Sequence, residues 1–147
     1  MRLAALAWSL AVLSASPATA QDGARIGTIK SMRGTAQVIG AGGNSTATVG
    51  SAVHQNDTLE TGADGALGLS FIDNTTLSMG ANSRIVLTRI VFNPDQGDLA
   101  FITNIVKGTF MFVSGSIAKL APQAVQITTP VSTIGIRGTR FLVKIEP

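Results

Sequence analysis

The fold of this chain is decided by the stretch Gly62-Ala63-Asp64-Gly65-Ala66-Leu67-Gly68-Leu69-Ser70-Phe71-Ile72-Asp73-Asn74. Its first four residues have the composition of a tight turn, because glycine accepts positive φ angles and aspartate hydrogen-bonds its own backbone. After the turn, large apolar residues alternate with small ones, so Leu67, Leu69 and Phe71 lie on one face. A period of two is typical of a half-buried β-strand.

Similar turn-then-strand units follow along most of the chain, at intervals of about ten residues. We expect strands at residues 26–32, 35–39, 58–61, 66–72, 75–79, 85–92, 99–106, 109–113, 125–129, 131–136 and 141–145. Residues 41–45 are expected to form a loop, and residues 117–120 are compatible with one helical turn. The 16 glycines fit many tight turns. The sequence predicts an all-β fold, a compact antiparallel β-sandwich or a rolled β-sheet, without the fixed repeat of a solenoid.

The first 20 residues have the pattern of a secretory signal peptide. A positive start at Arg2 precedes an apolar run from Leu3 to Leu13, and the stretch closes with the small-residue site Ala18-Thr19-Ala20. The apolar run is shorter than the ~20 residues that span a bilayer, although an uncleaved membrane anchor is the alternative. We expect cleavage after Ala20, one β domain over residues 21–147, no membrane span after cleavage, and a location in the periplasm or outside the cell.

Charge and composition narrow the classes of partner. The chain has 11 Lys and Arg against 8 Asp and Glu, a formal net charge of +3, and the charges are scattered. Without a basic tract and with aromatics at 5%, nucleic-acid binding is not expected. The chain has no cysteine, so packing alone must stabilise it.

The residues that carry catalysis are scarce. His54 is the only histidine, and no Gly-x-Ser-x-Gly elbow is present. Zinc needs several nitrogen or sulfur ligands, and the acidic stretches 57–60 and 95–98 lack the spacing of a calcium loop. We therefore predict no catalytic residue, no metal site and no cofactor. A pair of acidic side chains for glycoside hydrolysis stays an open alternative, because any two carboxylates could converge in the fold.

Three stretches resemble the FecR domain of bacterial signalling proteins, and the resemblance covers residues 26–143. Residues 50–65 are similar to its segment G-x-x-x-x-x-x-D-x-[IL]-x-T-G-x-x-G. Residues 69–83 are similar to F-x-D-G-T-x-L-x-L-G-x-x-S, with Asn74 where the glycine is usual. Residues 129–141 resemble the close T-P-x-A-x-x-x-[VI]-R-G-T-x-F. The motif positions are Asp57, Thr61, Gly62, Gly65, Asp73, Thr129, Pro130, Arg137, Gly138 and Thr139.

These motif residues are expected to serve the fold. Gly62 and Gly65 supply turn conformations, and Asp73 bonds its own turn. Pro130 keeps Thr129 extended. Arg137 is expected to clamp backbone carbonyls with its fork of donors; an Arg137 that contacts a ligand is the alternative.

The resemblance implies a role in protein contact. The best-known members of the family sit in the inner membrane and relay a signal from an outer-membrane transporter to a cytoplasmic sigma factor. This chain has a leader where those members have a cytoplasmic segment and a membrane helix, and it stops after the FecR close. We therefore expect the fold and the protein contact to carry over, and sigma-factor regulation not to.

Two readings of function follow, with an enzyme as the third. The first is an exported, non-enzymatic FecR-like binding module that contacts a periplasmic or outer-membrane protein in signalling, for instance by strand addition. The alternative is a surface or matrix component that serves structure or adhesion, binding glycans or self-associating. A carbohydrate-active enzyme would require two converging acidic residues.

Overall fold

The computed structural model describes residues 24–135 and 140–146. Over these residues the chain is all-β, as predicted. The signal peptide predicted at residues 1–20, its cleavage after Ala20, and the motif residues Arg137, Gly138 and Thr139 lie outside the described residues. The strands are β1 (Arg25–Arg33), β2 (Ala36–Gly40), β3 (Gly43–Thr46), β4 (Ala52–His54), β5 (Thr58–Thr61), β6 (Ala66–Phe71), β7 (Thr76–Met79), β8 (Arg84–Asn93), β9 (Asp98–Val113), β10 (Val125–Thr128), β11 (Thr133–Ile134) and β12 (Arg140–Ile145).

Three short helical elements accompany the strands. They are η1 (Pro94–Gln96), α1 (Ser116–Leu120) and η2 (Pro122–Ala124). The helical turn considered for residues 117–120 is thus present as α1. None of the helices in the described part of the chain has the length and apolar character needed to cross a membrane.

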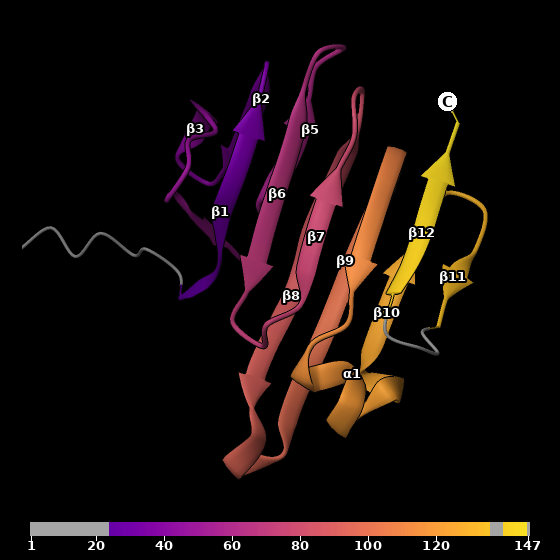
Figure 1. The fold of residues 1–147 in the computed structure, drawn as a ribbon. Helices are drawn as coiled ribbons and strands as arrows, with labels where there is room; N and C mark the ends of the chain where they lie inside the picture. The colour runs from indigo at the N-terminus through magenta and orange to yellow at the C-terminus, as the bar shows by residue number, and fades with distance from the viewer. Residues whose placement is uncertain (1–23, 136–139, 147) are drawn as a thin grey trace, which may run out of the picture.

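The strands form two layers that share β9. Sheet A has the order β4-β1-β6-β7-β9-β12, and sheet B has the order β3-β2-β5-β8-β9-β10-β11. Pairing is antiparallel except between β9 and β10, which run parallel. Figure 1 shows β1, β6, β7, β9 and β12 in this order across the front layer, with β8 and β10 in the layer behind. The result is a curled antiparallel sheet folded onto itself.

Strand β9 passes from one layer to the other. Its first part pairs with β8 and β10 in sheet B, and residues from Gly108 onward pair with β7 and β12 in sheet A. The sequence predicted two strands interrupted at Lys107-Gly108; the structure has one strand of 16 residues that continues through this point. Gly108 has φ +108°, and a Cβ there would overlap the Ser83 side chain. The glycine therefore redirects the strand without ending it.

The core lies between the two sheets. Leu67, Leu69 and Phe71 are all buried, as their alternation predicted. Phe71 of sheet A meets Phe101 of sheet B edge to face, with ring centroids 5.2 Å apart. Aromatic pairs of this geometry stabilise by about 0.5–1.5 kcal/mol beyond their buried area. Ile117 of α1 is also fully buried, so the helix covers part of the core.

Some strands were not predicted. Residues 41–45 were expected to be a loop, but Gly43–Thr46 forms β3 and pairs with β2. All four residues of β3 are exposed, so no apolar alternation marks it in the sequence. The short strand β4 was missed as well, and the strand expected at residues 131–136 is limited to Thr133–Ile134 in the described part.

Candidate interaction surface

The first family stretch forms two turns that fasten neighbouring strands. Asp57 is buried, and its Oδ2 accepts a hydrogen bond of 2.8 Å from the backbone N–H of His54. The carbonyl of Asp57 accepts another, of 2.9 Å, from Leu87 of β8. The His54 imidazole Nδ1 lies 3.8 Å from the same carboxylate oxygen. This carboxylate therefore closes the corner between β4 and β5.

Thr61 joins the first family stretch to the second. Its hydroxyl donates to the carbonyl of Gly80 at 2.6 Å and accepts from the N–H of Ser83 at 3.0 Å. Gly62 donates to the carbonyl of Thr35 at 2.9 Å, and Gly65 donates to Gly62 at 3.0 Å. A Cβ on Gly65 would overlap the backbone oxygen of Thr35. These residues hold the turn against the β1–β2 connection.

Asp73 is the most enclosed side chain among the described motif residues. It is 0% exposed, and its Oδ1 accepts a hydrogen bond of 3.1 Å from the N–H of Thr75. Its Oδ2 accepts one of 2.7 Å from the Thr75 hydroxyl and one of 3.2 Å from the N–H of Ile117. The carboxylate thus satisfies a free backbone donor in the first turn of α1, a group that helices leave without an internal partner.

Asn74 stands where the second motif usually has glycine. It has φ +67°, in the left-handed region. Glycine adopts this region freely, and asparagine is among the few other residues that visit it routinely. The replacement of glycine by Asn74 therefore keeps the backbone geometry of the turn.

Thr129 and Pro130 form the turn from β10 to β11. Thr129 is buried, and its N–H donates to the carbonyl of Ser132 at 2.7 Å. Its hydroxyl accepts from the N–H of Ser132 at 3.1 Å, while Pro130 is exposed. Each described motif residue that forms a side-chain hydrogen bond thus does so with its own turn or with the backbone of an element packed against that turn.

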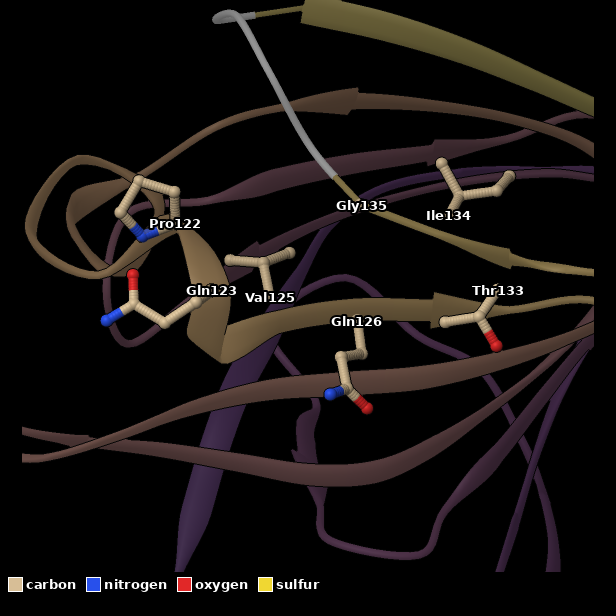
Figure 2. A pocket seen from close by; sticks show the side chains of 7 residues that line it. All are labelled: Pro122, Gln123, Val125, Gln126, Thr133, Ile134 and Gly135. Carbon is tan, nitrogen blue, oxygen red and sulfur yellow. The ribbon is translucent and has the colours of Figure 1, made fainter.

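The depression beside β10 and β11 has no charged side chain among its described lining residues. It is an open hollow of about 660 Å³ bounded by η2, β10 and β11 (Figure 2). Its side chains are neutral, and its polar groups are the amides of Gln123 and Gln126 and the hydroxyl of Thr133. In the described ranges, no group of three or more His, Asp or Glu side chains is placed to hold a metal ion.

The outer face of sheet A has a different character, because its central strands carry small side chains. Two rows cross the face in register. One runs Thr28, Ser70, Thr76, Val113 and Arg140, and the next runs Ser31, Gly68, Ser78, Met111 and Leu142. A shallow depression of about 290 Å³ lies over the second row, with Ser31, Gly68 and Ser78 in its lining. We call this surface the A face.

Cationic side chains flank the small residues of the A face. Arg25 and Lys30 of β1 line a hollow of about 110 Å³ with Thr28 and Ser70, and Arg33 borders the larger depression. On the far side, Arg140 and Lys144 belong to β12. Glu146 lies 3.4 Å from Lys144, whereas Arg25, Lys30, Arg33 and Arg140 form no ion pair with another described residue.

Sheet B differs in part, because two of its cations, Arg84 and Arg89, have acidic neighbours, whereas Lys107 of β9 forms no ion pair with another described residue. Arg84 lies 3.6 Å from Glu60, and Arg89 lies 3.8 Å from Asp98. Sequence reasoning saw scattered charges and did not single out Arg25, Lys30 or Arg33. Strand order groups them with β12, and no local signal in the sequence gives that order. Two features of the A face were visible in the sequence: the small residues that alternate with Leu67, Leu69 and Phe71, and the closely spaced cations Arg140 and Lys144.

Comparison with known proteins shows the family of this chain. No curated protein and no solved structure is significantly similar to the chain. A family model, described as FecR protein, matches residues 57–147. The match takes in most of the first motif stretch and all of the second and third, including the turns of Asp57, Asp73 and Thr129. It spans more than half of the sequence, and the chain therefore belongs to the FecR family.

Proposed function

We propose that this chain is an exported, non-enzymatic binding module whose A face docks an acidic protein partner in the periplasm or at the outer membrane. The observation that carries the proposal is the segregation of charge. Small, neutral side chains of β6 and β7 occupy the middle of the A face, with Val113 and Met111 of β9 beside them, and cations of β1 and β12 border it. The signal peptide at residues 1–20 and the single domain at residues 21–147 are part of the proposal.

The family supports the cellular context. FecR is a regulatory family associated with periplasmic signalling. A relay of this kind works through contact between proteins, for which a broad surface is better suited than a reactive pocket. The finer statement, that this chain uses the A face for such contact, is ours.

The physical properties of the A face suit an acidic protein. The side chain of Ser31 lies over Gly68, where a Cβ would overlap its hydroxyl, so small polar groups form this part of the A face. Unneutralised cations raise the rate of encounter with an oppositely charged surface, and the effect weakens as salt screens the charges. At about 0.15 M ionic strength the screening length is ~8 Å, so binding should be sensitive to salt.

The arrangement of the carboxylates supports a non-enzymatic role. Asp57 and Asp73 are buried and bonded within their turns. Glu60, Asp98 and Glu146 each lie beside an Arg or Lys. A glycosidase instead needs two carboxyl groups roughly 5–9 Å apart across a substrate cleft.

Charge reversal tests the proposal. The variant Lys30→Glu/Arg33→Glu should reduce the recovery of a crosslinked acidic protein from periplasmic extract by at least ~10-fold, a change of about 1.4 kcal/mol in binding. The control Arg89→Glu/Lys119→Glu changes the net charge equally but lies off the A face, and it should retain recovery. Equal loss in both variants, or capture of a glycan instead of a protein, would contradict the proposal. Circular dichroism and Tm establish that both variants fold.

The alternative, a surface component that self-associates, is favoured by one separate observation. This observation is that, among the described residues, β12 pairs with β9 alone.

A further inference from the structure

Strand β12 is the last strand of sheet A in the part of the chain that the structure describes. On one side it pairs with β9, from Arg140 opposite Val113 to Ile145 opposite Gly108. No other strand in the described ranges pairs with it. It is six residues long, and its register with β9 has no bulge. An edge of this kind presents unpaired N–H and C=O groups to any strand that fits beside it.

The side chains of β12 leave apolar surface exposed at this edge. Val143 is buried, whereas Phe141 and Ile145 on the same inner face are only partly buried. The Phe141 ring stacks on Phe112 with centroids 4.9 Å apart. On the outer face, Leu142 is 63% exposed and lies opposite Met111, which is 40% exposed. A strand added at β12 would cover apolar groups on both faces.

We propose that the occupant of this edge is the β12 strand of a second copy of this chain, paired antiparallel about a two-fold axis at Val143. In this register Val143 faces Val143 of the second copy, Phe141 faces Ile145, and Leu142 faces Lys144. At both ends Arg140 faces Glu146, so the symmetry forms the oppositely charged pair twice. Residues directly opposite each other in antiparallel strands interact, and opposite charges there stabilise the pairing.

The sequence of β12 selects this register over its neighbours. A shift that centres the axis on Leu142 places Arg140 opposite Lys144, and one that centres it on Lys144 places two lysines together. Both put like charges directly opposite each other, which is destabilising. An axis between two residues would set inner-face side chains opposite outer-face ones, because side chains alternate along a strand. The Val143 register matches apolar with apolar on the inner face and cation with acid at the ends. An axis at Ile145 would also pair Lys144 with Glu146, but it would leave Arg140, Phe141 and Leu142 without opposite residues, so the Val143 register pairs the longer stretch.

The dimer joins two copies of sheet A into one continuous sheet. The A faces then lie on the same side of that sheet, and their β12 cations are brought close to the two-fold axis. Glu146 already lies 3.4 Å from Lys144 of its own chain. In the dimer it also meets Arg140 of the second copy, so one acid is shared between two cations. The inference stands independently of the acidic partner, because pairing of two copies needs no other protein.

Oligomeric state and a charge swap form the first test. Sedimentation velocity of the full chain, purified as the cell processes it, should show a concentration-dependent dimer at 0.05 M salt. Arg140→Glu should raise the dimer Kd by at least ~10-fold, because attraction becomes repulsion at two places. Glu146→Arg should do the same, and the double variant Arg140→Glu/Glu146→Arg should return the Kd to within ~3-fold of the original. A strict monomer up to ~100 µM, or a dimer that neither single variant weakens, overturns the proposal.

Cysteine crosslinking tests the register, and the chain offers a clean background because it has no cysteine. The variant Val143→Cys places the two thiols directly opposite each other, where Cα atoms of antiparallel pairs are ~4.5–5.5 Å apart and within disulfide range. Leu142→Cys is the matched control. It is more exposed, but it meets its own copy only diagonally. We expect the disulfide dimer from Val143→Cys; preferential crosslinking of Leu142→Cys shows a different register and overturns the proposal.

Discussion

The carboxylate of Asp73 accepts a hydrogen bond from the backbone N–H of Ile117, at 3.2 Å and across 44 positions of sequence. The bond joins the β6–β7 turn to the first turn of α1. Through it the second family stretch fixes the position of the helix that covers the aromatic part of the core. Asp73 therefore belongs to a local turn but also stabilises a helix that lies far away in the sequence.

Replacement of Asp73 should be among the most damaging changes to a polar residue. Asp73→Ala removes the acceptor of three hydrogen bonds and leaves their donors buried without partners. We expect the free energy of unfolding to fall by about 2–4 kcal/mol, measured by urea denaturation. The exposed Asp95 provides the control, because Asp95→Ala should change stability by no more than about 0.5 kcal/mol. Similar values for the two variants would contradict the role given to Asp73.

Substitution of Gly43 and Gly108, which have the same φ, distinguishes the cost of backbone strain from the cost of steric overlap. Gly43 and Gly108 both have φ +108°, but a Cβ on Gly43 meets nothing within 4 Å, whereas a Cβ on Gly108 overlaps Ser83. Gly43→Ala should lower the free energy of unfolding by about 1–2 kcal/mol through backbone strain alone. Gly108→Ala should cost clearly more, with a Tm below that of Gly43→Ala. Equal losses of unfolding free energy in the two variants would mean that Ser83 moves aside at little cost.

The turn at Asn74 predicts an unusual pattern of substitution. Because Asn74 has φ +67°, Asn74→Gly should leave Tm within a few degrees of the original, since glycine adopts this angle without a Cβ penalty. Asn74→Ala should lower the free energy of unfolding by about 1 kcal/mol, because the Cβ of alanine clashes with the backbone in the left-handed region and alanine has no polar side chain to offset the clash. An alanine variant as stable as the glycine variant would show that the turn relaxes.

Because Phe71 of sheet A contacts Phe101 of sheet B, loss of either ring should destabilise the core between the sheets. Phe101→Ala should lower the free energy of unfolding by about 3–5 kcal/mol, since Phe101 is 1% exposed and leaves a cavity between the layers. Leu120→Ala, on α1 and 61% exposed, should have little effect. Thermal and urea unfolding followed by circular dichroism would measure both. A small loss for Phe101→Ala would indicate that the layers can collapse into the cavity.

Sequence patterns predicted the elements whose two faces differ. Leu67, Leu69 and Phe71 alternate with small residues, and the alternation reports burial directly. Strand β3 has four exposed residues and so no contrast between faces, which is why its sequence resembles a loop. Gly108 was expected to end one strand and separate it from the next. The sequence does not distinguish a glycine that bends a strand from one that ends it.

The A face lay beyond prediction for a different reason. Arg33 and Lys144 are more than a hundred positions apart in the sequence, and only the strand order β1-β6-β7-β9-β12 places them on one surface. The order of pairing depends on contacts between distant strands, whereas alternation is a local property. The leader at residues 1–20 and the roles of Arg137, Gly138 and Thr139 stay predictions, since they lie outside the described residues.

Strand β9 belongs to both layers as one uninterrupted backbone, and this continuity affects how the protein unfolds. Neither layer can lose β9 without removing a strand from the interior of the other, so partial melting of one layer alone is disfavoured. We expect all amide groups at the centre of β9 to exchange with solvent only through global opening, at a common rate on both sides of Gly108. A sandwich made of two separate sheets would have no such reason to open as one unit.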